Sequence, residues 1–377
     1  MKGKQGLVCM GLLLVLSSCH TGKQITASGL QRKDFQTEVN GQHTDLFTLS
    51  NKQGMEVCIT NYGARVVSIL VPDRNGKRED VVCGFSTITE YMEQRQNFGS
   101  TVGRYIGRIL NARFTLDGVE YKLVPNNGKS GHISHGGNPG FADRIWKVEQ
   151  ADTHRVRLSY LSPDGENGFP GNLKVTLVYS LGEDDNALDL TYEATTDAPT
   201  VLNLSHHSFF NISGNFTKSV EDQQLWVDAD RFTPYDDKKC VTGEYLPVAG
   251  TPLDFRMPHT IGECIDADHP QLKVVNGYDH TWELNTKGDD TRPAAWVYDP
   301  ASGRKMEIFT TEPGIQIYTG NGLKGKMTGK GGIAYPFRSA VCFETMHFQD
   351  SPNQPGFPST VLRPGEVFRS HTVYKFE

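Results

Sequence analysis

The chain has 377 residues, of which 37% are hydrophobic and 22% charged, so it is long enough to bury one large core or two ordinary ones. Its formal net charge is −6 at pH 7 and no basic stripe runs along it, which argues against nucleic acid as a partner. Glycine and proline are frequent and scattered, as is typical of many short strands joined by tight turns.

The first residues have the pattern of an export signal. Two lysines precede an apolar run over 7–16, which ends at Leu-Ser-Ser-Cys19. A basic start, a short apolar run and small residues at the end describe a cleaved secretory signal, too short for a membrane-spanning helix. The ending resembles the bacterial lipobox, so we predict a signal peptide over 1–18 and lipidation of Cys19. The alternative is an ordinary cleaved signal with an incidental cysteine.

Residues 19–34 are then predicted to be the lipidated cysteine and a polar tether, which anchors the protein outside the cytoplasm at the bacterial cell envelope. The sequence leaves open which membrane carries the anchor. Without Cys9 and Cys19 five cysteines remain, with no CxxC spacing, so no disulfide framework is predicted. A single disulfide between Cys240 and Cys264 is left open.

Alternation of apolar and polar side chains dominates after the tether. In the clearest case every second residue of 173–181 is apolar, a polar turn follows, and 188–194 resumes the period. This pattern predicts a hairpin with one buried face. Further strands are predicted from similar runs at 64–71, 156–161, 295–298, 306–310, 314–319, 340–345 and 367–376.

A helical period is visible only over 88–96. Many short strands with almost no helix indicate an all-β sandwich or barrel. Neither a change in composition nor an internal repeat divides the chain after the tether. We therefore predict a single β domain over 35–377.

Two stretches carry candidate chemistry. In 200–211 an apolar, β-favouring run leads into His206 and His207. Neighbouring side chains of a strand point to opposite faces, so only one of these histidines can face a cleft. In 340–347 a lone carboxylate, Glu344, lies within an apolar strand, where an unpaired charge is costly. A histidine and a half-buried carboxylate are the minimum set for general acid–base chemistry. For the stretch 200–211 taken alone, the simpler alternative is a hydrogen-bonded histidine in the core.

Other motifs are weaker. Residues 320–325 match the dinucleotide pattern GxGxxG, but the glycine-rich residues after them cannot begin the helix that such a site needs, so a loop is predicted. The histidines at 132, 135, 206 and 207 lack zinc-ligand spacing. No catalytic metal is therefore predicted, and a structural calcium ion is left open.

Polar and aromatic clusters suited to a carbohydrate recur along the chain. They include Gly103–Arg108, His135-Gly136-Gly137, Asn203–Asn211, Gly277–His280, Gln316–Gly320 and Cys342–Thr345. In this order they resemble the aldose 1-epimerase (mutarotase) family, and the resemblance runs from about Val57 to Phe376.

The resemblance implies the galactose mutarotase-like fold, a large antiparallel β-sandwich. It also implies that the protein interconverts the α and β anomers of a free aldose such as galactose or glucose, without a cofactor, and we expect a monomer. Carried over by motif, Glu344 is the expected general base for the C1 hydroxyl and His207 the general acid for the ring oxygen. The groups expected to bind the sugar are Arg108, His135, Asp279 and Gln316.

This chain departs from the family pattern at three positions. The family commonly has Asn where Gly107 precedes the sugar-binding arginine, Leu where Ser134 precedes His-Gly-Gly, and Asn in place of His206. These changes bear on the sugar preference, which the sequence leaves open. Two alternative functions are a non-catalytic carbohydrate-binding lipoprotein and an epimerase of hexose 6-phosphates. The latter needs a cluster of basic residues to hold the phosphate, for which only Arg108 is a clear candidate.

Overall fold

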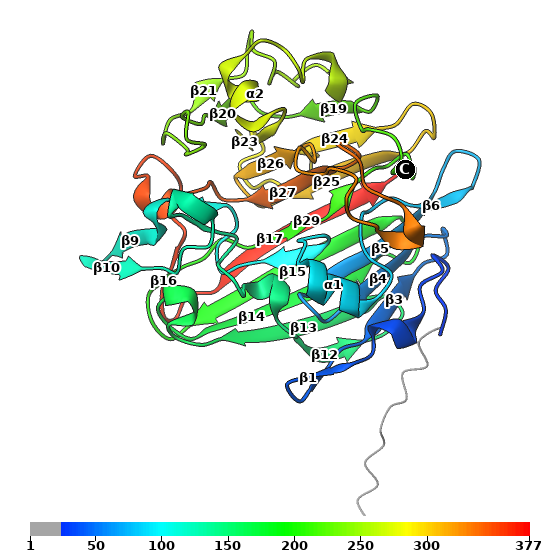
Figure 1. Cartoon of the computed structure of the whole chain (residues 1–377), viewed down its shortest axis with the longest axis horizontal. Helices are drawn as coiled ribbons and strands as arrows, with labels where there is room; N and C mark the ends of the chain where they lie inside the picture. The colour runs from blue at the N-terminus through cyan, green and yellow to red at the C-terminus, as the bar shows by residue number, and fades with distance from the viewer. Residues whose placement is uncertain (1–23) are drawn as a thin grey trace, which may run out of the picture.

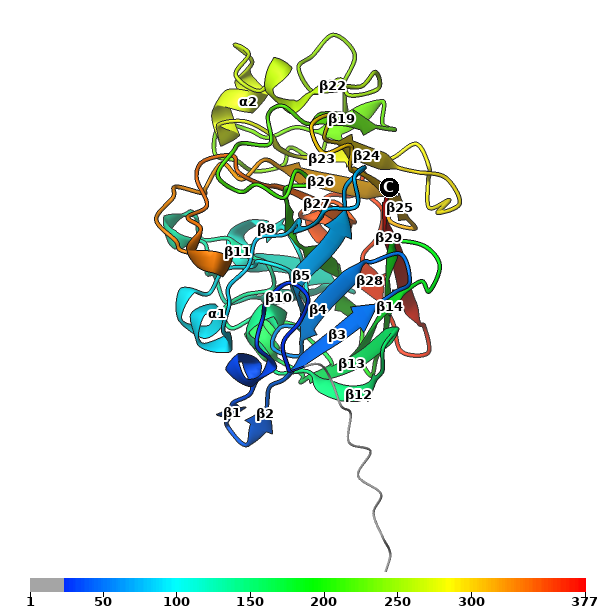
Figure 2. The same cartoon turned by 90° about the vertical axis from the view of Figure 1, so that its right-hand side faces the viewer.

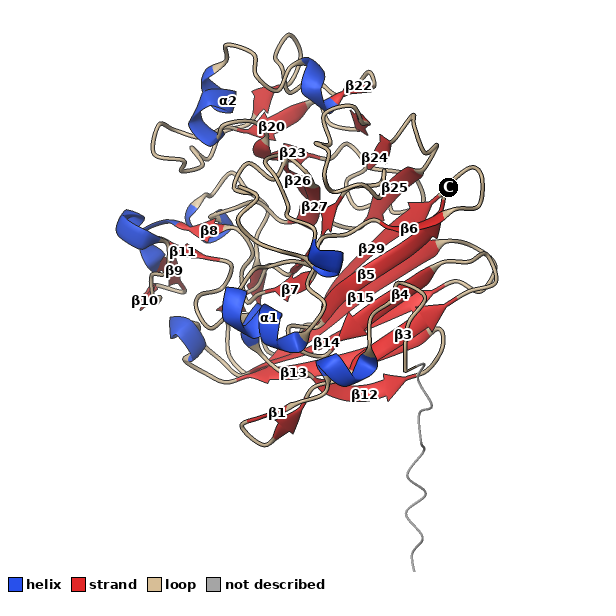
Figure 3. Cartoon of the chain, turned by 45° about the vertical axis from the view of Figure 1, so that its right-hand side comes forward, coloured by secondary structure: helices blue, strands red, loops and turns tan. Residues whose placement is uncertain are grey.

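The computed structural model describes residues 24–377, so the predicted signal peptide and Cys19 lie outside the described residues. Strands predominate and loops join them (Figure 3). The two α-helices of this part are α1 (Ile88–Gln94) and α2 (Pro270–Val275), and none of its helices is long and apolar enough to cross a membrane. Short 3₁₀ turns occur at Arg32–Phe35, Leu110–Ala112, Gly128–Ser130, Phe141–Asp143, Glu166–Gly168, Ile261–Glu263, Lys330–Gly332 and Ser351–Asn353.

A nine-stranded antiparallel sheet forms one layer of the molecule (Figure 1). In spatial order its strands are β12 (Lys147–Ala151), β13 (Arg155–Ser162), β14 (Leu173–Leu181), β15 (Ala187–Thr196), β29 (Phe368–Phe376), β25 (Lys305–Thr310), β24 (Ala295–Tyr298), β19 (Gln224–Val227) and β22 (His259–Thr260). The hairpin predicted around residue 184 is β14–β15, and the inward residues of β14 are all buried.

Two smaller antiparallel sheets form the facing layer, and Figure 2 shows β3, β4 and β5 lying over β13 and β14. The four-stranded sheet contains β3 (Leu46–Ser50), β4 (Glu56–Thr60), β5 (Arg65–Pro72) and β6 (Arg78–Asp80). The six-stranded sheet has the order β18 (Phe209–Phe210), β27 (Val341–Met346), β26 (Gly314–Tyr318), β23 (Asp279–Glu283), β20 (Arg231–Thr233) and β21 (Leu246–Pro247). A bridge between Val82 and Phe210 joins these two sheets.

The described chain also has five short two-stranded ladders. They pair β1 (Glu38–Val39) with β2 (Gln42–His43), β7 (Ser100–Val102) with β17 (Ser205–His207), β8 (Arg108–Ile109) with β11 (Ile133–Ser134), β9 (Arg113–Leu116) with β10 (Val119–Lys122), and β16 (Thr200–Val201) with β28 (Val361–Leu362). The ladder of β7 with β17 and the ladder of β8 with β11 carry residues of the site described below.

The core lies between the two layers, where the inward face of β14 meets the apolar residues of β4 and β5. The strands β4 and β5 are buried on both faces, because their other face is covered by α1, by the residues before β1 and by the segment after β26. Strands covered on both sides favour continuous apolar runs rather than alternation. This explains why 64–71 is mostly apolar, and why Arg65 and Ser68, its two polar residues, are buried as well.

Helix α1 confirms the helix predicted over 88–96. Thr87 caps it, since its hydroxyl accepts a hydrogen bond from the Glu90 backbone N–H while the Glu90 carboxylate accepts one from the Thr87 backbone. Helix α2 was not predicted. It has only six residues, beginning with Pro270 after His269, and such a length is too short to display a helical period.

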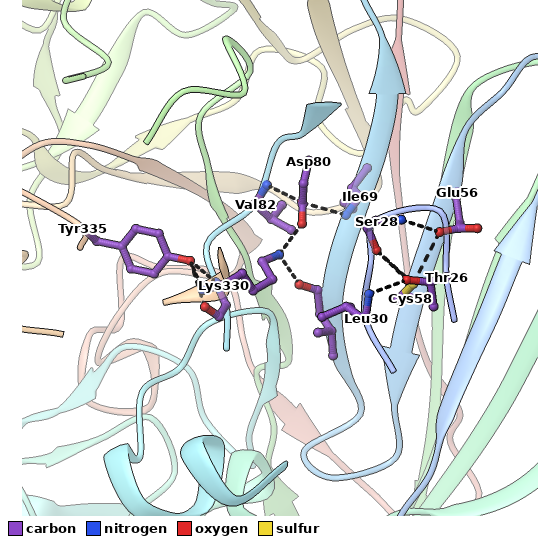
Figure 4. Close-up of polar contacts among 12 residues, drawn as sticks. Thr26, Ser28, Leu30, Glu56, Cys58, Ile69, Asp80, Val82, Lys330 and Tyr335 are labelled. Carbon is purple, nitrogen blue, oxygen red and sulfur yellow. Dashed lines mark hydrogen bonds and ion pairs between the residues drawn. The ribbon is translucent and has the colours of Figure 1, made fainter. Parts of the chain in front are cut away.

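The tether predicted over 19–34 is wrong for the residues that the structure describes. Ile25 bridges Gln31, and Thr26 and Leu30 are buried. The carboxylate of Glu56 on β4 accepts hydrogen bonds from the backbone N–H groups of Ala27, at 2.7 Å, and Ser28, at 3.2 Å (Figure 4). Residues 24–34 are therefore a packed segment that ends in the turn at Arg32–Phe35 and lies on β4.

The segment 320–335 forms turns and no α-helix, which confirms that its GxGxxG pattern is a loop. Its end is fixed by polar contacts. The Lys330 ammonium lies 2.6 Å from a carboxylate oxygen of Asp80, and the Tyr335 hydroxyl donates to the backbone oxygen of Gly84 (Figure 4). The segment consequently covers the outer face of β5.

Candidate active site

A cavity of about 260 Å³ opens over one face of the six-stranded sheet. The structure brings together there all six residues that the sequence singled out for catalysis or sugar binding: Arg108, His135, His207, Asp279, Gln316 and Glu344. They come from five strands and one loop, so the fold and not the sequence spacing assembles them.

Glu344 occupies the centre of this face. It lies on β27 directly opposite Gln316 on β26, and Gln316 lies opposite Thr281 on β23. The carboxyl group is almost completely buried. Burial raises its pKa well above the ordinary value, and the nearby charge of Asp279 adds to this rise while Arg108 opposes it. A carboxyl group in this position can both accept and return a proton near neutral pH.

His207 faces Glu344 across the cavity. Its Nε2 atom lies 3.4 Å from Oε1 of Glu344, and its ring stacks on Phe209 with centroids 5.0 Å apart. It projects from β17, which pairs with β7 and places His207 opposite Ser100. Burial is the main cause that lowers the pKa of His207 to about 4.

The neighbouring His206 points the other way, as expected for adjacent residues of a strand. It is buried, its Nε2 atom lies 2.7 Å from the Ser208 hydroxyl, and its ring contacts Tyr179 and Tyr374. The prediction that only one of the two histidines faces a cleft is confirmed: His207 lines the cavity, and His206 belongs to the core.

His135 approaches His207 from the loop after β11. The ring centroids are 5.4 Å apart, and His135 has a left-handed backbone with φ of 52°. Burial, with smaller contributions from His207 and Arg108, lowers the pKa of His135 to about 3. Gly136 makes the sharp turn feasible, since a Cβ atom there would lie 2.0 Å from the backbone oxygen of Gly103. His135 is therefore a neutral polar group beside the catalytic candidates.

A polar wall completes the cavity. Gln316 donates from Nε2 to Oδ1 of Asp279 at 2.6 Å, and its Oε1 accepts from the Thr281 hydroxyl at 2.5 Å. Burial raises the pKa of Asp279, against the opposing effects of Arg108 and of the Gln316 hydrogen bond. Fixed donors and acceptors around a small cavity suit a ligand that carries several hydroxyl groups.

Comparisons with known proteins identify the family. The sequence profile described as "Aldose 1-epimerase" matches residues 45–375. The chain is 39% identical to pig galactose mutarotase over 330 residues, covering 88% of this chain and 93% of the relative. It is 36% identical to the aldose 1-epimerase of Escherichia coli K12 over 339 residues, covering 89% of this chain and 96% of the relative. The chain belongs to the aldose 1-epimerase family.

Solved structures agree with this assignment. A GalM/aldose epimerase homologue from C. elegans superposes with a TM-score of 0.81 at 31% identity, covering 89% of this chain and 99% of the other. A galactose 1-epimerase from Lactobacillus acidophilus superposes with a TM-score of 0.78 at 28% identity, covering 90% of this chain and 96% of the other. The predicted galactose mutarotase-like, all-β antiparallel fold and the predicted family of isomerases are both confirmed.

Further residues line this aldose 1-epimerase cavity beyond the six predicted site residues, and of these only Gly107 and Ser134 had been connected with sugar preference. The additional lining residues are Gln96, Asn97, Gly107, Ser134, Phe209, Tyr318, Met346 and Gln349. Tyr318 and Met346 had a usable signal, because each is two residues from a predicted site residue on the same strand and therefore shares its face. Gln349 follows β27 in a loop, where no period marks its direction.

Two residues of the cavity, His207 and Glu344, form with the neighbouring Cys342 a group of side chains that could hold a metal ion. Ligand atoms of His207, Cys342 and Glu344 lie within 4.8 Å of one another, and all three residues are buried. A nitrogen, a sulfur and an oxygen ligand suit zinc more than calcium or magnesium. Two of these residues are the catalytic candidates, so a metal bound there would occupy the groups that carry protons.

The remaining cysteine and histidine candidates lie apart from this group. Cys240 and Cys264 are free thiols, so the disulfide left open by the sequence is absent. His132 lies near Cys240, with Nε2 3.2 Å from the sulfur, and its Nδ1 accepts a hydrogen bond from the Asn111 backbone. The four histidines considered as a metal site are therefore not gathered together: His132 pairs with Cys240 and His206 lies in the core.

Proposed function

We propose that the cavity binds a free aldohexose such as galactose or glucose and interconverts its α and β anomers by general acid–base catalysis. The observation that carries this proposal is the pairing of His207 with Glu344, 3.4 Å apart, in a cavity lined with hydrogen-bonding groups. Opening a hemiacetal ring requires one proton to leave the C1 hydroxyl and another to reach the ring oxygen. A carboxylate and an imidazolium ion supply these two functions.

In the proposed reaction Glu344 accepts the C1 hydroxyl proton while His207 donates a proton to the ring oxygen. The C1–O5 bond breaks and its electron pair stays on O5, leaving an open-chain aldehyde. Rotation about the C1–C2 bond presents the other face of the carbonyl. Reclosure returns both protons and forms the opposite anomer, so atoms and charges are restored after each turnover and no metal or cofactor is required.

The electrostatics of the pair favour ring opening. The reactive state holds one proton on the pair, with Glu344 as carboxylate and His207 as imidazolium. Burial raises the pKa of Glu344 and lowers the pKa of His207, so both groups prefer their neutral forms. Proton transfer through the sugar converts the charged pair into the neutral pair, and the buried environment therefore assists this step.

The polar wall is proposed to hold the sugar hydroxyls. Arg108 supplies guanidinium donors, Asp279 a carboxylate acceptor and Gln316 an amide that already bonds to Asp279. His135, with its pKa lowered to about 3, stays neutral and is placed to bond near the ring oxygen beside His207. These groups orient the sugar so that its C1 hydroxyl meets Glu344 and its ring oxygen meets His207.

Polarimetry of freshly dissolved α-D-galactose and α-D-glucose tests the proposal. The purified protein should speed the approach to the equilibrium rotation, and the Glu344→Gln variant should not. No acceleration by the wild-type protein for any common aldose, together with sugar binding by calorimetry, would favour the non-catalytic binding protein instead. Faster turnover of glucose 6-phosphate than of glucose would favour an epimerase of hexose phosphates, for which Arg108 is the single basic residue among those lining the described cavity.

We also propose that the protein is an exported lipoprotein, lipidated on Cys19, and acts as a monomer at the cell envelope. The support is the sequence Leu-Ser-Ser-Cys after a basic and apolar start. Expression of the full chain in a bacterium with a labelled fatty acid should label the protein and place it in the membrane fraction. Cys19→Ala should abolish both, whereas an unlabelled soluble wild-type protein would contradict this proposal.

A further inference from the structure

Gln349 occupies space beside Gly107 at the edge of the sugar cavity. Gly107 has φ of 75°, and a Cβ atom added there would lie 2.6 Å from Cγ and 3.2 Å from Cδ of Gln349. Real Cβ atoms do not approach other atoms so closely, and so a side chain at 107 and the observed position of Gln349 exclude each other. Position 107 is also the one where this chain has glycine and its family commonly has asparagine.

The amide of Gln349 connects the groups that line the polar wall. Its Nε2 donates to the Tyr235 hydroxyl at 2.7 Å and to Oε1 of Gln316 at 3.3 Å. Its Oε1 accepts from Nη1 of Arg108 at 3.4 Å. The side chain is 4% exposed, so these bonds form with little competition from water.

The donor and acceptor roles in this network are fixed by chemistry. Arg108 can only donate, so it requires the oxygen of Gln349. Asp279 accepts from Gln316, which turns the Gln316 oxygen toward Thr281 and Gln349. Gln349 must then present its NH₂ group to Gln316, and the whole chain of bonds has one consistent orientation.

We propose that Gln349 is a positioning and specificity-determining residue of the epimerase site. It fills the space that a side chain at position 107 would occupy, and its hydrogen bonds align Arg108 and Gln316 for the sugar hydroxyls. This inference rests on the proposed function. Its bonds reach two of the proposed hydroxyl-binding residues and neither member of the proton-transferring pair. Loss of the Gln349 amide therefore weakens sugar binding more than it slows the chemical step.

Substitution of Gln349 in the full-length protein tests this role. Gln349→Ala should raise KM by about 5-fold or more, as expected for loss of hydrogen bonds to buried polar groups, and should change kcat much less. The increase should differ between galactose and glucose, since a shifted Arg108 and Gln316 meet the two C4 epimers unequally. The control Gln223→Ala removes another buried amide, which bonds to Asn211 outside the cavity, and should leave both KM values unchanged.

A rescue experiment tests the exclusion between positions 107 and 349. Gly107→Asn alone should impair sugar binding severely, because its side chain meets Cγ of Gln349, although asparagine tolerates positive φ. Adding Gln349→Ala removes Cγ and Cδ and should restore part of the lost kcat/KM. Adding Gln349→Met keeps the stem and should not restore it.

The outcomes separate this inference from the proposed function. An active wild-type protein whose KM values stay within about twofold in Gln349→Ala would overturn the role of Gln349 and leave the epimerase assignment standing. Equal effects of Gln349→Ala and Gln349→Met on Gly107→Asn would overturn the steric exclusion. A wild-type protein without activity would overturn the proposed function itself.

Discussion

Nε2 of His207 lies 3.4 Å from Oε1 of Glu344, and burial moves the pKa of each residue toward its neutral form. The two residues come from β17 and β27, which belong to different sheets. Because proton transfer needs both groups, the fold makes catalysis depend on the contact between these strands.

Removal of either proton carrier should abolish most of the activity. We expect Glu344→Gln and His207→Asn each to reduce kcat by about 10²–10⁴-fold, because each change removes a general acid or base and little volume. Polarimetry gives the rates and circular dichroism checks the fold. His206→Asn is the matched control: it faces the core, so it should lower the melting temperature and retain kcat. Wild-type rates in His207→Asn would refute the assigned role.

The activity should show a bell-shaped dependence on pH. The pair is reactive when it holds one proton, so the acid limb should lie near the pKa of about 4 that burial gives His207. The alkaline limb should lie well above the ordinary carboxyl range, because burial raises the pKa of Glu344. Replacing Asp279 by Asn removes a charge that contributes to this rise and should shift the alkaline limb downward. An unchanged limb in that variant would contradict the proposed coupling.

A surface histidine between two carboxylates should make stability depend on pH. Hydrogen bonds and charge from Asp189, and then Asp290, raise the pKa of His371 to about 9, with ring nitrogens 3.0 and 2.7 Å from the two carboxylates. The folded pKa lies above the ordinary value, so the stabilisation is complete below about pH 6.5 and is lost as the pH rises through 9. Thermal melts at pH 6.5 and 10 measure it. In His371→Gln the part of the melting-temperature difference between pH 6.5 and 10 that comes from this histidine should disappear. If the variant shows the same difference as the wild-type protein, His371 is not its source.

Metal should be unnecessary for activity and harmful at the catalytic pair. Prolonged treatment with EDTA should leave the rate unchanged, since side chains alone carry the protons. Added Zn²⁺ should inhibit, because His207, Cys342 and Glu344 present three ligand atoms within 4.8 Å of one another. Cys342→Ala removes the sulfur ligand and should raise the inhibitory zinc concentration several-fold. Loss of activity on chelation, restored by a metal, would show that the mechanism is incomplete.

The fold was largely predictable because its strands obey simple periods. β14 and β15 alternate cleanly, since one face of each is buried, and the same reasoning recovered β13, β24, β25, β26, β27 and β29 to within a residue or two. Helix α2 was not predicted, because its six residues are too few to display the helical period. The segment 24–34 was misjudged because its polar residues look solvated, whereas Glu56 binds its backbone.

The site was less accessible from physical reasoning alone. Glu344 stood out because a charge in an apolar strand needs an explanation, and the pair His206 and His207 because only one of two neighbouring histidines can face a cleft. The family resemblance, not the strand period, selected His207 from this pair. Arg108, His135, Asp279 and Gln316 were found through the family resemblance. Gln349 had no such signal: what directs it into the cavity is the missing side chain of Gly107, and such a relation between distant positions is visible only in three dimensions.

The attachment of residues 24–34 to β4 would, in a lipidated protein, limit the distance between the folded domain and the membrane. If Cys19 carries lipid, as we propose, four residues separate it from Gln24, where the described structure begins. Even fully extended, the five steps from Cys19 to Gln24 span about 17 Å. The start of the described chain lies near β3, at the opposite end from α2 (Figure 1). With that lipid in place the enzyme would sit close against the membrane surface with its β3 side inward, confined to a thin layer in which it meets sugars as they reach the membrane.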